Sequence, residues 1–494
     1  MISSCSLILS IYIGYQRNPG ITNGAVLVTE TQTGKVRAYV GSQDFFDFEG
    51  HSQVNGVIAP RSSGSVLKPF LYALAIDEGI IIPQTLIKDV PTYFDAFAPN
   101  NADENYNGIV TSKDALIRSL NIPAVRLLNT YGVYRFYSFL KTTGVSTLFR
   151  TADDYGLPLI IGGAEITVWD INMLFRGLAN NGIFSPTYYL KKDSSNTENS
   201  PQLISPGACY LTLEMMKELK RSGAEYYWQQ YQNQKPIAWK TGTSYGHKDA
   251  WAVGVSPQWT IAVWIGNFDG EGNKNLSGAK SAGPLMFEIF NYLPYDPQKK
   301  WFEKVEMNFK NAIICNQTGF LASEYCDKRD TVDVPMFMHP LRLCPFHQNI
   351  YVDKSEKYAV CSYCWKPGYR EKHILSYPAE VENLLKRGQI IEQVPEHKPG
   401  CIHLSSINLI DFLYPADSAL IQIPRDFDEQ YQKIISKIAH KKPGNKVYWY
   451  LDDFYLGSTI NNHSKAIDLD VGWHVIMVID EEGYKNEVKV YVRK

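Results

Sequence analysis

The sequence predicts an α+β domain with an antiparallel sheet, followed by a cysteine-rich region and an all-β module. Three observations support this. Strand-like runs over residues 24–42 and 237–266 flank a long helical stretch, which is typical of an α+β domain. Six of the eight cysteines fall between residues 315 and 401, where periodicity is weak. Beyond residue 404, about seven short alternating runs separated by turn signals predict a small β-sandwich.

We therefore expect four parts. Residues 1–23 are a remnant N-terminal linker, 24–295 a catalytic-type domain, 296–403 a Cys-rich linker and 404–494 a β-sandwich module. The apolar start, Met1–Gly14, lacks a basic n-region and a small-residue cleavage site, so it does not read as a signal peptide. No stretch reaches the ~20 apolar residues of a membrane span. The net charge of −2 gives no indication of nucleic-acid binding.

The elements of the first domain follow from local patterns. Gly24–Glu30 and Lys35–Ser42 are β-rich and are joined by Thr31-Gln32-Thr33-Gly34, which predicts a hairpin. A helix is expected from near Ser65 to Gly79, and a second from Asn121, with Asn121 as its N-cap. Further helices are predicted over 112–119, 133–143, 168–180, 210–221 and 277–293, and further strands over 237–244, 250–255 and 260–266.

The C-terminal strands are predicted from alternation of apolar and polar residues. Pro443-Gly444-Asn445 and Glu482-Gly483 supply turn signals between them. The expected strands cover 407–414, 420–424, 434–440, 447–451, 465–469, 474–479 and 487–492.

Ser65 and Lys68 are the first candidate pair for chemistry. Positions three apart on a helix lie on one face, which places the Lys68 amine beside the Ser65 hydroxyl. A buried amine with a lowered pKa takes the proton of such a hydroxyl and makes it a nucleophile. A lone Ser-x-x-Lys more often means a capped helix and a solvent-facing lysine, so the assignment depends on the rest of the chain.

Two further motifs follow in order. They are Ser119-Leu120-Asn121 and Lys240-Thr241-Gly242-Thr243-Ser244, the latter on a predicted strand. Taken singly, each reads as a helix cap or a strand end. In this order, with Ser65 and Lys68, they form the set that acyl transfer requires. Lys68 is the base, and Lys68 and Ser119 are candidates to relay the proton to the leaving amine.

The remaining residues of these motifs have expected roles in binding. Asn121 holds the substrate amide and orients Lys68, while Lys240 attracts a substrate carboxylate and lowers the pKa of Lys68. Thr241, Thr243 and Ser244 belong to the expected substrate-binding strand, and Gly242 lets a substrate backbone lie along it. The backbone N–H groups of Ser65 and Thr243 are expected to form the oxyanion hole.

These motifs resemble the transpeptidase domain of class A penicillin-binding proteins. The likeness includes the run 61–70, the Gly162-Gly163-Ala164-Glu165 loop and the motifs above. The runs 414–417, 449–453 and 469–472 resemble the C-terminal module of the 1C type of these proteins. The resemblance covers residues 20–295 and 404–494. The family's glycosyltransferase domain and membrane anchor have no counterpart in this sequence, so crosslinking without glycan polymerisation is expected.

The resemblance implies a periplasmic serine D-Ala-D-Ala transpeptidase, membrane-associated in its full-length relatives, with a penicillin-binding/β-lactamase-like fold. Ser65 would form an acyl-enzyme with peptidoglycan stem peptides ending in D-Ala-D-Ala, and β-lactam antibiotics would acylate the same serine. No cofactor is expected. A glycosyltransferase or another envelope protein is the expected partner of residues 404–494.

Alternative functions stay open from the sequence. A DD-carboxypeptidase or β-lactamase would hydrolyse the acyl-enzyme, and Glu165 is the one family-like loop carboxylate that such an enzyme would use; we expect it to anchor the loop instead. A non-catalytic penicillin-recognising sensor or scaffold would be acylated without turnover. A Ser-Ser-Lys amidase using Ser62, Ser63 and Lys68 is disfavoured, because its glycine-rich loop is absent.

The cysteine cluster has two interpretations. Disulfides are favoured by an oxidising compartment. Alternatively, Cys344, His347, Cys361 and Cys364 bind zinc, since their Cys-x2-His and Cys-x2-Cys spacings are compatible with a metal site. Cys5 and Cys209 are expected to be buried thiols, and His440, His463 and His474 to be structural.

Overall fold

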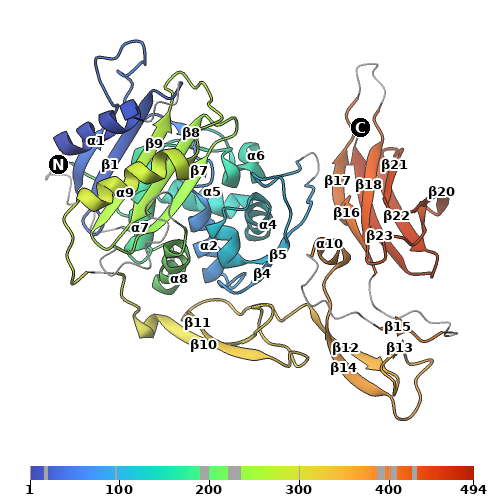
Figure 1. The fold of residues 1–494 in the computed structure, drawn as a ribbon. Coiled ribbons are helices and arrows are strands. Elements are labelled where there is room, and N and C mark those ends of the chain that lie inside the picture. The colour runs from blue at the N-terminus through green and yellow to red at the C-terminus, as the bar shows by residue number, and fades with distance from the viewer. Residues whose placement is uncertain are drawn as a thin grey trace. The chain divides into compact units, whose positions relative to one another are not determined.

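The computed structural model shows two compact units, each built from several segments of the chain (Figure 1). Unit 1 comprises Met1–Thr85, Thr111–Ala312 and Thr331–Arg342. Unit 2 comprises Leu86–Val110, Ile313–Asp330 and Leu343–Lys494. The structure describes residues 2–15, 20–94, 97–189, 200–220, 235–299, 301–385, 395–399, 401, 409–425 and 431–493.

Unit 1 is organised on a five-stranded sheet in the order β2-β1-β9-β8-β7. All of its neighbouring strands pair antiparallel, as predicted for an α+β domain. β1 and β2 form the predicted hairpin, and the three strands expected near residues 237–266 are β7, β8 and β9. The strand bounds are Asn23–Glu30 (β1), Val36–Val40 (β2), Ala238–Thr243 (β7), Asp249–Val255 (β8) and Trp259–Gly266 (β9).

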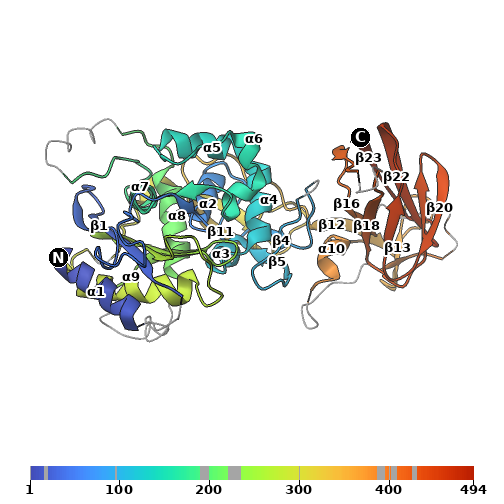
Figure 2. The same ribbon diagram turned by 90° about the horizontal axis from the view of Figure 1, so that it is seen from above.

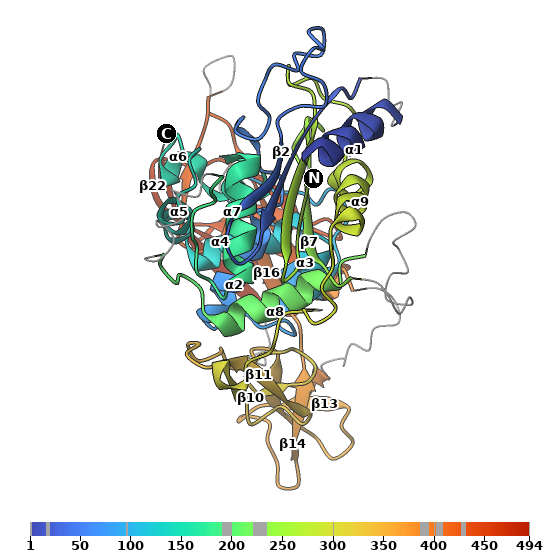
Figure 3. The same cartoon turned by 90° about the vertical axis from the view of Figure 1, so that its left-hand side faces the viewer.

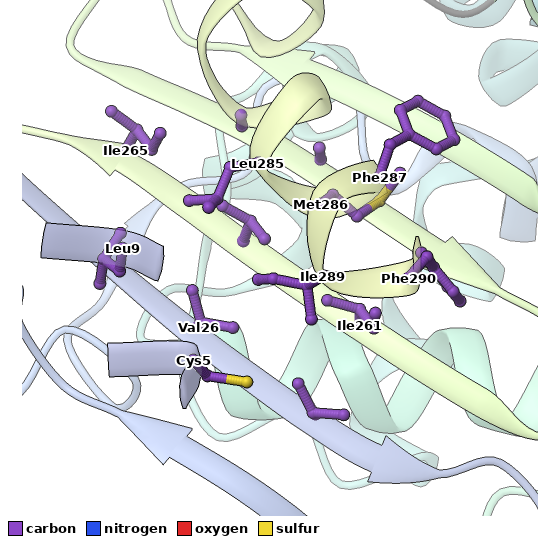
Figure 4. Close-up of a cluster of buried hydrophobic side chains, with 14 of the residues drawn as sticks. Cys5, Leu9, Val26, Ile261, Ile265, Leu285, Met286, Phe287, Ile289 and Phe290 are labelled. Atoms are coloured by element: carbon purple, nitrogen blue, oxygen red, sulfur yellow. The ribbon is translucent and has the colours of Figure 1, made fainter. Parts of the chain in front are cut away.

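Helices cover both faces of this sheet. α1 (Ile2–Tyr15) and α9 (Gly283–Tyr292) lie on one face, while α7 (Val168–Ala179) lies on the other (Figure 3). The core between the sheet and the first pair of helices contains Phe287 and Phe290 of α9 together with Cys5 and Leu9 of α1 (Figure 4). Residues 1–23 are therefore not a simple linker, because α1 buries side chains in the main core.

The helical part of unit 1 carries the site. Short strands β3 (Arg61–Ser62) and β6 (Glu165–Ile166) pair with each other beside it. The other helical elements are α2 (Lys68–Asp77), α3 (Ser112–Ile117), α4 (Asn121–Tyr131), α5 (Val133–Thr142), α6 (Ala152–Tyr155), η1 (Leu157–Ile161), α8 (Pro206–Lys217), the π-helical turn η4 (Gly278–Ala282) and the short 3₁₀ helix η5 (Glu306–Asn308). α8 is predicted over 210–221; it begins at Pro206 and ends at Lys217, and residue 221 lies outside the described residues. Among the described helices, none combines the length and apolarity that crossing a bilayer requires.

The Cys-rich region is more regular than a linker. It forms a four-stranded sheet in the order β14-β12-β13-β15. The strands are β12 (His347–Val352), β13 (Tyr358–Val360), β14 (Arg370–Leu375) and β15 (Glu396–His397), with α10 (Ala379–Glu382) nearby in sequence. Two more pairs of strands are β4 (Leu86–Asp89) with β5 (Gly108–Thr111), and β10 (Phe309–Cys315) with β11 (Arg329–Pro335).

The C-terminal module is a β-sandwich, coloured orange to red in Figure 2. Its sheets have the orders β16-β18-β21 and β17-β23-β22-β19-β20. Both sheets contribute to one core around Ile410, Trp449 and Val490. The bounds are Ile410–Tyr414 (β16), Ala419–Gln422 (β17), Ile434–His440 (β18), Val447–Leu451 (β19), Phe454–Thr459 (β20), Ser464–Ile467 (β21), Gly472–Asp480 (β22) and Lys485–Arg493 (β23). All seven predicted strands are present, although residues 407–408 lie outside the described ones, and β20 is additional.

Candidate active site

Ser65 lies in a turn just before helix α2, and the helix begins at Lys68 instead of near Ser65. The Lys68 N–H donates to the Ser65 carbonyl at 3.3 Å, which closes the turn. Gly64 has a φ of +51°, and a Cβ there would lie 2.8 Å from the Thr243 nitrogen. A glycine at position 64 therefore allows strand β7 to run directly against the turn that presents Ser65.

The Lys68 side chain is fully buried, and its amine lies within hydrogen-bonding distance of three oxygens of residues 119–121. Its Nζ donates to the carbonyls of Ser119 (2.8 Å) and Leu120 (3.1 Å) and to Asn121 Oδ1 (2.8 Å). The sequence predicts Lys68 buried between Ser65, Ser119 and Asn121; its burial and its contacts to Ser119 and Asn121 are confirmed. The contact between its amine and the Ser65 hydroxyl stays a prediction. Asn121 was expected to cap α4, but it is the first helical residue and its side chain accepts from Lys68.

Ser119 adopts a backbone conformation that L-residues seldom occupy. Its φ is +58°, in the left-handed region. In this conformation its carbonyl accepts from Lys68 while its hydroxyl accepts from Lys240 Nζ at 2.7 Å. Such conformations concentrate at functional sites, where surrounding contacts maintain them. Ser119 therefore connects the two lysines.

The two buried amines both have lowered pKa values. Burial, followed by the positive charge of Lys240, holds the pKa of Lys68 well below its ordinary value. Burial alone lowers the pKa of Lys240 to about 7. These shifts favour the neutral form of Lys68. A neutral amine has two N–H groups, so it would keep two of the three hydrogen bonds and gain a lone pair; its role as the base stays a prediction.

Strand β7 is one of the two edge strands of the sheet, so one side of its backbone has no neighbouring strand within the sheet. The Ser244 N–H donates to the Asp249 carbonyl on the β8 side. Because successive N–H groups along a strand alternate in direction, the Thr243 N–H points away from β8. A Cβ at Gly242 would lie 2.9 Å from the Ser63 carbonyl oxygen and 3.3 Å from the Ser65 nitrogen. The N–H groups of Ser65 and Thr243 thus belong to adjoining segments, and their role as an oxyanion hole stays a prediction.

The other residues of the β7 motif have different surroundings. Thr243 Oγ1 accepts a hydrogen bond from the Gly278 N–H of η4 at 3.1 Å. Ser244 Oγ accepts from the Asp249 N–H at 2.8 Å and thereby stabilises the turn into β8. Thr241 lies near Gly278, half-buried, and its carbonyl accepts from Lys240. The structure therefore brings Gly242 to Ser65, Thr243 to the neighbouring Gly64 and Lys240 to Ser119, and it gives Ser244 a role in the turn.

Glu165 anchors its loop, as expected. It lies on β6, and its carboxylate oxygens accept from Arg150 at 2.7 and 2.8 Å. Its backbone pairs with Ser62 of β3, just before the Ser65 turn. Ser62 Oγ donates to the Gly162 carbonyl at 2.7 Å, and Ser63 is fully buried. The serines neighbouring Ser65 thus support the loop.

The cysteines divide into two groups, which corrects the single four-residue set predicted from spacing. Cys344 and His347 belong to one group with Cys315 and Cys326. Cys361 and Cys364 belong to the other with His397 and Cys401. The ligand atoms within each group lie within 4.8 Å of one another. A His-x3-Cys spacing at 397–401 was the overlooked sequence signal.

The predicted buried or structural residues elsewhere behave as expected. Cys5 and Cys209 are buried. His440 Nε2 contacts Asp480 Oδ2 at 3.0 Å, His463 Nε2 contacts the Pro443 carbonyl, and His474 Nε2 contacts the Asp470 carbonyl. These three histidines connect strands and turns of the sandwich.

Comparison with known proteins gives two family matches. Residues 24–291 match the penicillin binding protein transpeptidase domain, and residues 404–490 match the Penicillin-Binding Protein C-terminus Family. The chain is 35% identical over 289 residues to penicillin-binding protein 1C of Escherichia coli K12, covering 57% of this chain and 37% of that protein. It is 30% identical over 293 residues to penicillin-binding protein 1A of Neisseria lactamica, covering 55% and 35%. The chain thus spans little more than a third of these relatives.

Solved structures share the fold. Penicillin-binding protein 1A from Haemophilus influenzae matches with a TM-score of 0.53 and 20% identity, over 66% of this chain and 55% of that one. The PonA1 protein from Mycobacterium tuberculosis, solved in complex with penicillin V, matches with a TM-score of 0.52 and 20% identity, over 62% and 86%.

Proposed function

We propose, from the premise that this chain belongs to the penicillin-binding protein transpeptidase domain family, that it crosslinks peptidoglycan stem peptides through an acyl-enzyme on Ser65. The family supports a penicillin-binding function in peptidoglycan synthesis and a serine acyltransferase type of enzyme. The observation that carries the finer proposal is the buried Lys68 amine, held by three acceptors of the Ser119–Asn121 segment and flanked by Lys240.

In the proposed acylation step, neutral Lys68 takes the proton of the Ser65 hydroxyl. The Ser65 oxygen attacks the carbonyl between the two terminal D-alanines, and the N–H groups of Ser65 and Thr243 stabilise the oxyanion. The peptide C–N bond then breaks. The leaving D-alanine receives its proton through Lys68 or Ser119, and the C-terminal carboxylate is attracted by Lys240 and the hydroxyls of Thr241 and Thr243.

In the second step an amine of another stem peptide attacks the Ser65 ester. Lys68 accepts the proton of that amine, the C–O bond of the ester breaks, and Ser65 regains its hydroxyl. Glu165 is paired with Arg150, so it does not activate a hydrolytic water in this arrangement. We therefore favour transfer to an amine over hydrolysis, with DD-carboxypeptidase activity as the alternative.

Intact-mass measurement after penicillin treatment tests the nucleophile. One penicillin is expected to add per chain, and peptide mapping should place it on Ser65. Ser65→Ala should abolish the adduct, whereas Ser62→Ala, whose hydroxyl bonds to the loop carbonyl of Gly162, should retain it. An adduct on Ser65→Ala would refute the assignment.

Crosslinking itself requires a second assay. Polymerised peptidoglycan with D-Ala-D-Ala stems should yield crosslinked stem-peptide dimers with the unsubstituted chain and none with Ser65→Ala. Release of D-alanine without dimers would favour the carboxypeptidase, and rapid nitrocefin turnover a β-lactamase. Acylation with neither reaction would favour a penicillin-recognising sensor or scaffold.

The cellular setting is part of the same proposal. We place the protein in the periplasm, where stem peptides are crosslinked, and assign residues 404–494 to docking on a glycosyltransferase or another envelope protein. Deletion of 404–494 should leave Ser65 acylation intact and abolish partner capture in the envelope. Unchanged localisation and partner binding after this deletion would refute the docking role.

A further inference from the structure

Two groups of side chains in unit 2 have the composition and spacing of structural metal sites. We propose that each group binds one Zn²⁺ ion through three cysteine sulfurs and one histidine nitrogen. The first group, site A, is Cys315, Cys326, Cys344 and His347, and the second, site B, is Cys361, Cys364, His397 and Cys401. Cys₃His is one of the ligand sets of four-coordinate structural zinc.

The distances in site A match those around a tetrahedral zinc ion. Zn–S bonds of about 2.3 Å and Zn–N bonds of about 2.0–2.1 Å place tetrahedral S and N ligands about 3.6 Å apart. His347 Nδ1 lies 3.3 Å from Cys344 Sγ and 3.5 Å from Cys315 Sγ. All four ligand atoms lie within 4.8 Å of one another, which is compatible with one ion between them.

The surroundings of site A favour metal ligation. His347 Nε2 lies 3.1 Å from Gln317 Oε1, an acceptor, so Nε2 carries the proton and the Nδ1 lone pair faces the sulfurs. The Ser323 N–H donates to Cys326 Sγ at 3.4 Å, and Thr318 Oγ1 lies 3.2 Å from Cys344 Sγ. Donors directed at sulfur stabilise the thiolate form that binds metal.

Site B is built from two short sequence motifs, Cys361-x2-Cys364 and His397-x3-Cys401, and its distances also match a tetrahedral zinc ion. Cys361 Sγ lies 3.6 Å from Cys401 Sγ and 3.9 Å from Cys364 Sγ, and Cys364 Sγ lies 3.7 Å from His397 Nε2. Tetrahedral sulfurs on zinc are about 3.8 Å apart. The Cys361 N–H donates to Cys364 Sγ at 3.2 Å, while the parallel pairing of β15 with β13 brings His397 beside Ala359.

Disulfides explain these groups less well. Each group contains three cysteines, so one disulfide would leave a third thiol and a histidine facing it. The sulfur–sulfur distances of 3.6 and 3.9 Å in site B far exceed the ~2.05 Å of a bond. None of the eight cysteines, all of which the structure describes, is joined in a disulfide.

The local cores show why metal would matter here. The core cluster at site A has five buried residues, and three of them are Cys315, Cys326 and Cys344. A neighbouring cluster has three, Ile350, Val352 and Ile374. Segments with so little apolar core generally need disulfides or a metal for stability. The two ions would therefore hold together the strands of the region between residues 313 and 401.

Metal analysis of the purified full chain tests the proposal. Inductively coupled plasma mass spectrometry should find two zinc ions per chain. Cys344→Ala and Cys361→Ala should each retain one, and the double variant none. Cys209→Ala, a buried cysteine outside both sites, should retain two. Two ions remaining in either single variant, or iron in place of zinc, would overturn the assignment.

Measurements on the unsubstituted chain test the proposal even if the cysteine variants fail to fold. Thiol titration in denaturant without reductant should count eight thiols, and an organomercurial should release two zinc ions into a colorimetric indicator. Cobalt(II) exchanged into the protein should give tetrahedral thiolate absorption bands. An intact mass lower by two hydrogens for each disulfide would show that these six cysteines form disulfides. That result would refute the proposal whether or not Ser65 is acylated.

Discussion

Protonation at the candidate active site is a property of two residues together. Lys68 and Lys240 are both buried, and Lys240 contributes to the lowered pKa of Lys68 through its charge. Burial is the larger cause. Removing the Lys240 amine therefore raises the pKa of Lys68 without restoring its ordinary value.

Replacing Lys240 by Gln should shift the pH dependence of penicillin acylation. Loss of the Lys240 charge raises the Lys68 pKa, so the neutral base forms only at higher pH. The acidic limb of the plot of rate against pH therefore shifts to higher pH. The midpoint of that limb is the readout, since weaker carboxylate attraction would lower the rate at every pH. The exposed Lys280→Gln is the control. An unmoved or lowered midpoint would contradict this coupling.

Two substitutions of Ser119 distinguish the effect of its hydroxyl on acylation from the effect of its backbone conformation on stability. Ser119→Gly and Ser119→Ala both remove the hydroxyl bonded to Lys240, so both should acylate slowly. At a φ of +58°, alanine is disfavoured relative to glycine by about 1 kcal/mol. The glycine variant should therefore have the higher free energy of unfolding in urea. Equal stability of the two variants would show that the left-handed conformation carries no cost.

For single residues, the sequence shows which side chains the motifs contain but not their backbone conformations. Ser65, Lys68 and Lys240 were recognisable because acyl transfer requires those groups in motifs of that order. The backbone of Ser119 and the close approach at Gly64 depend on Lys240 and Thr243, which are distant in sequence. Asn121 was predicted as a cap from local preference, but a buried lysine amine outcompetes a capping bond for its oxygen.

Strand β7 packs directly against the Ser65 turn at Gly242, so a change in one is expected to displace the other. Gly242→Ala would place a Cβ 2.9 Å from Ser63 O and Val66 Cγ1. The turn must shift to relieve this contact, and a displacement approaching 1 Å slows catalysis by roughly a hundredfold. We expect penicillin acylation to fall at least tenfold, measured by stopped-flow. Gly14→Ala, with open space around it, should leave the rate unchanged.

Helix α1 is an integral element of unit 1. Leu9 is fully buried, whereas Leu7, two residues away, is 61% exposed. Leu9→Ala should lower the free energy of unfolding by about 2–5 kcal/mol, because it leaves a cavity under the sheet. Leu7→Ala should change it by less than about 0.5 kcal/mol. If denaturant titrations gave equal changes in the free energy of unfolding for the two variants, residues 1–23 would instead be interpreted as a linker.

Elements were predictable where one face is clearly apolar. β18 and β19 coincide with the predicted ranges because their buried residues alternate. β20 was missed because Phe454–Thr459 has no buried residue and so no alternation. The role of α1 was missed because its apolar residues surround the helix and only tertiary contacts select Cys5 and Leu9.

The whole molecule has separate cores in its two units. The core of the unit 1 sheet and that of the sandwich have no residue in common. Leu86–Val110 groups with unit 2, although the sequence placed it inside the first domain. Local patterns do not reveal such exchange of segments, because it depends on contacts with residues more than two hundred positions away.

Destabilising the sandwich should leave the chemistry intact. Ile476 is fully buried in the sandwich, and Ile476→Ala should lower its stability by about 2–5 kcal/mol. Ile435→Ala, at a position 54% exposed, is the matched control. In both variants the rate of Ser65 acylation should stay within about twofold of the unsubstituted chain, since all proposed catalytic residues lie in unit 1. A parallel loss of acylation would show that the sandwich supports the site.

The pairing of β1 with β9 has a consequence for biosynthesis. Glu30 pairs with Trp259, so about 230 residues must be made before β1 meets its inner neighbour. At roughly 5–20 residues per second, this takes about 10–50 seconds. During that time the β1–β2 hairpin presents an unpaired, apolar edge to its surroundings. Faithful assembly of the chain therefore depends on keeping this edge from other nascent strands until β9 emerges.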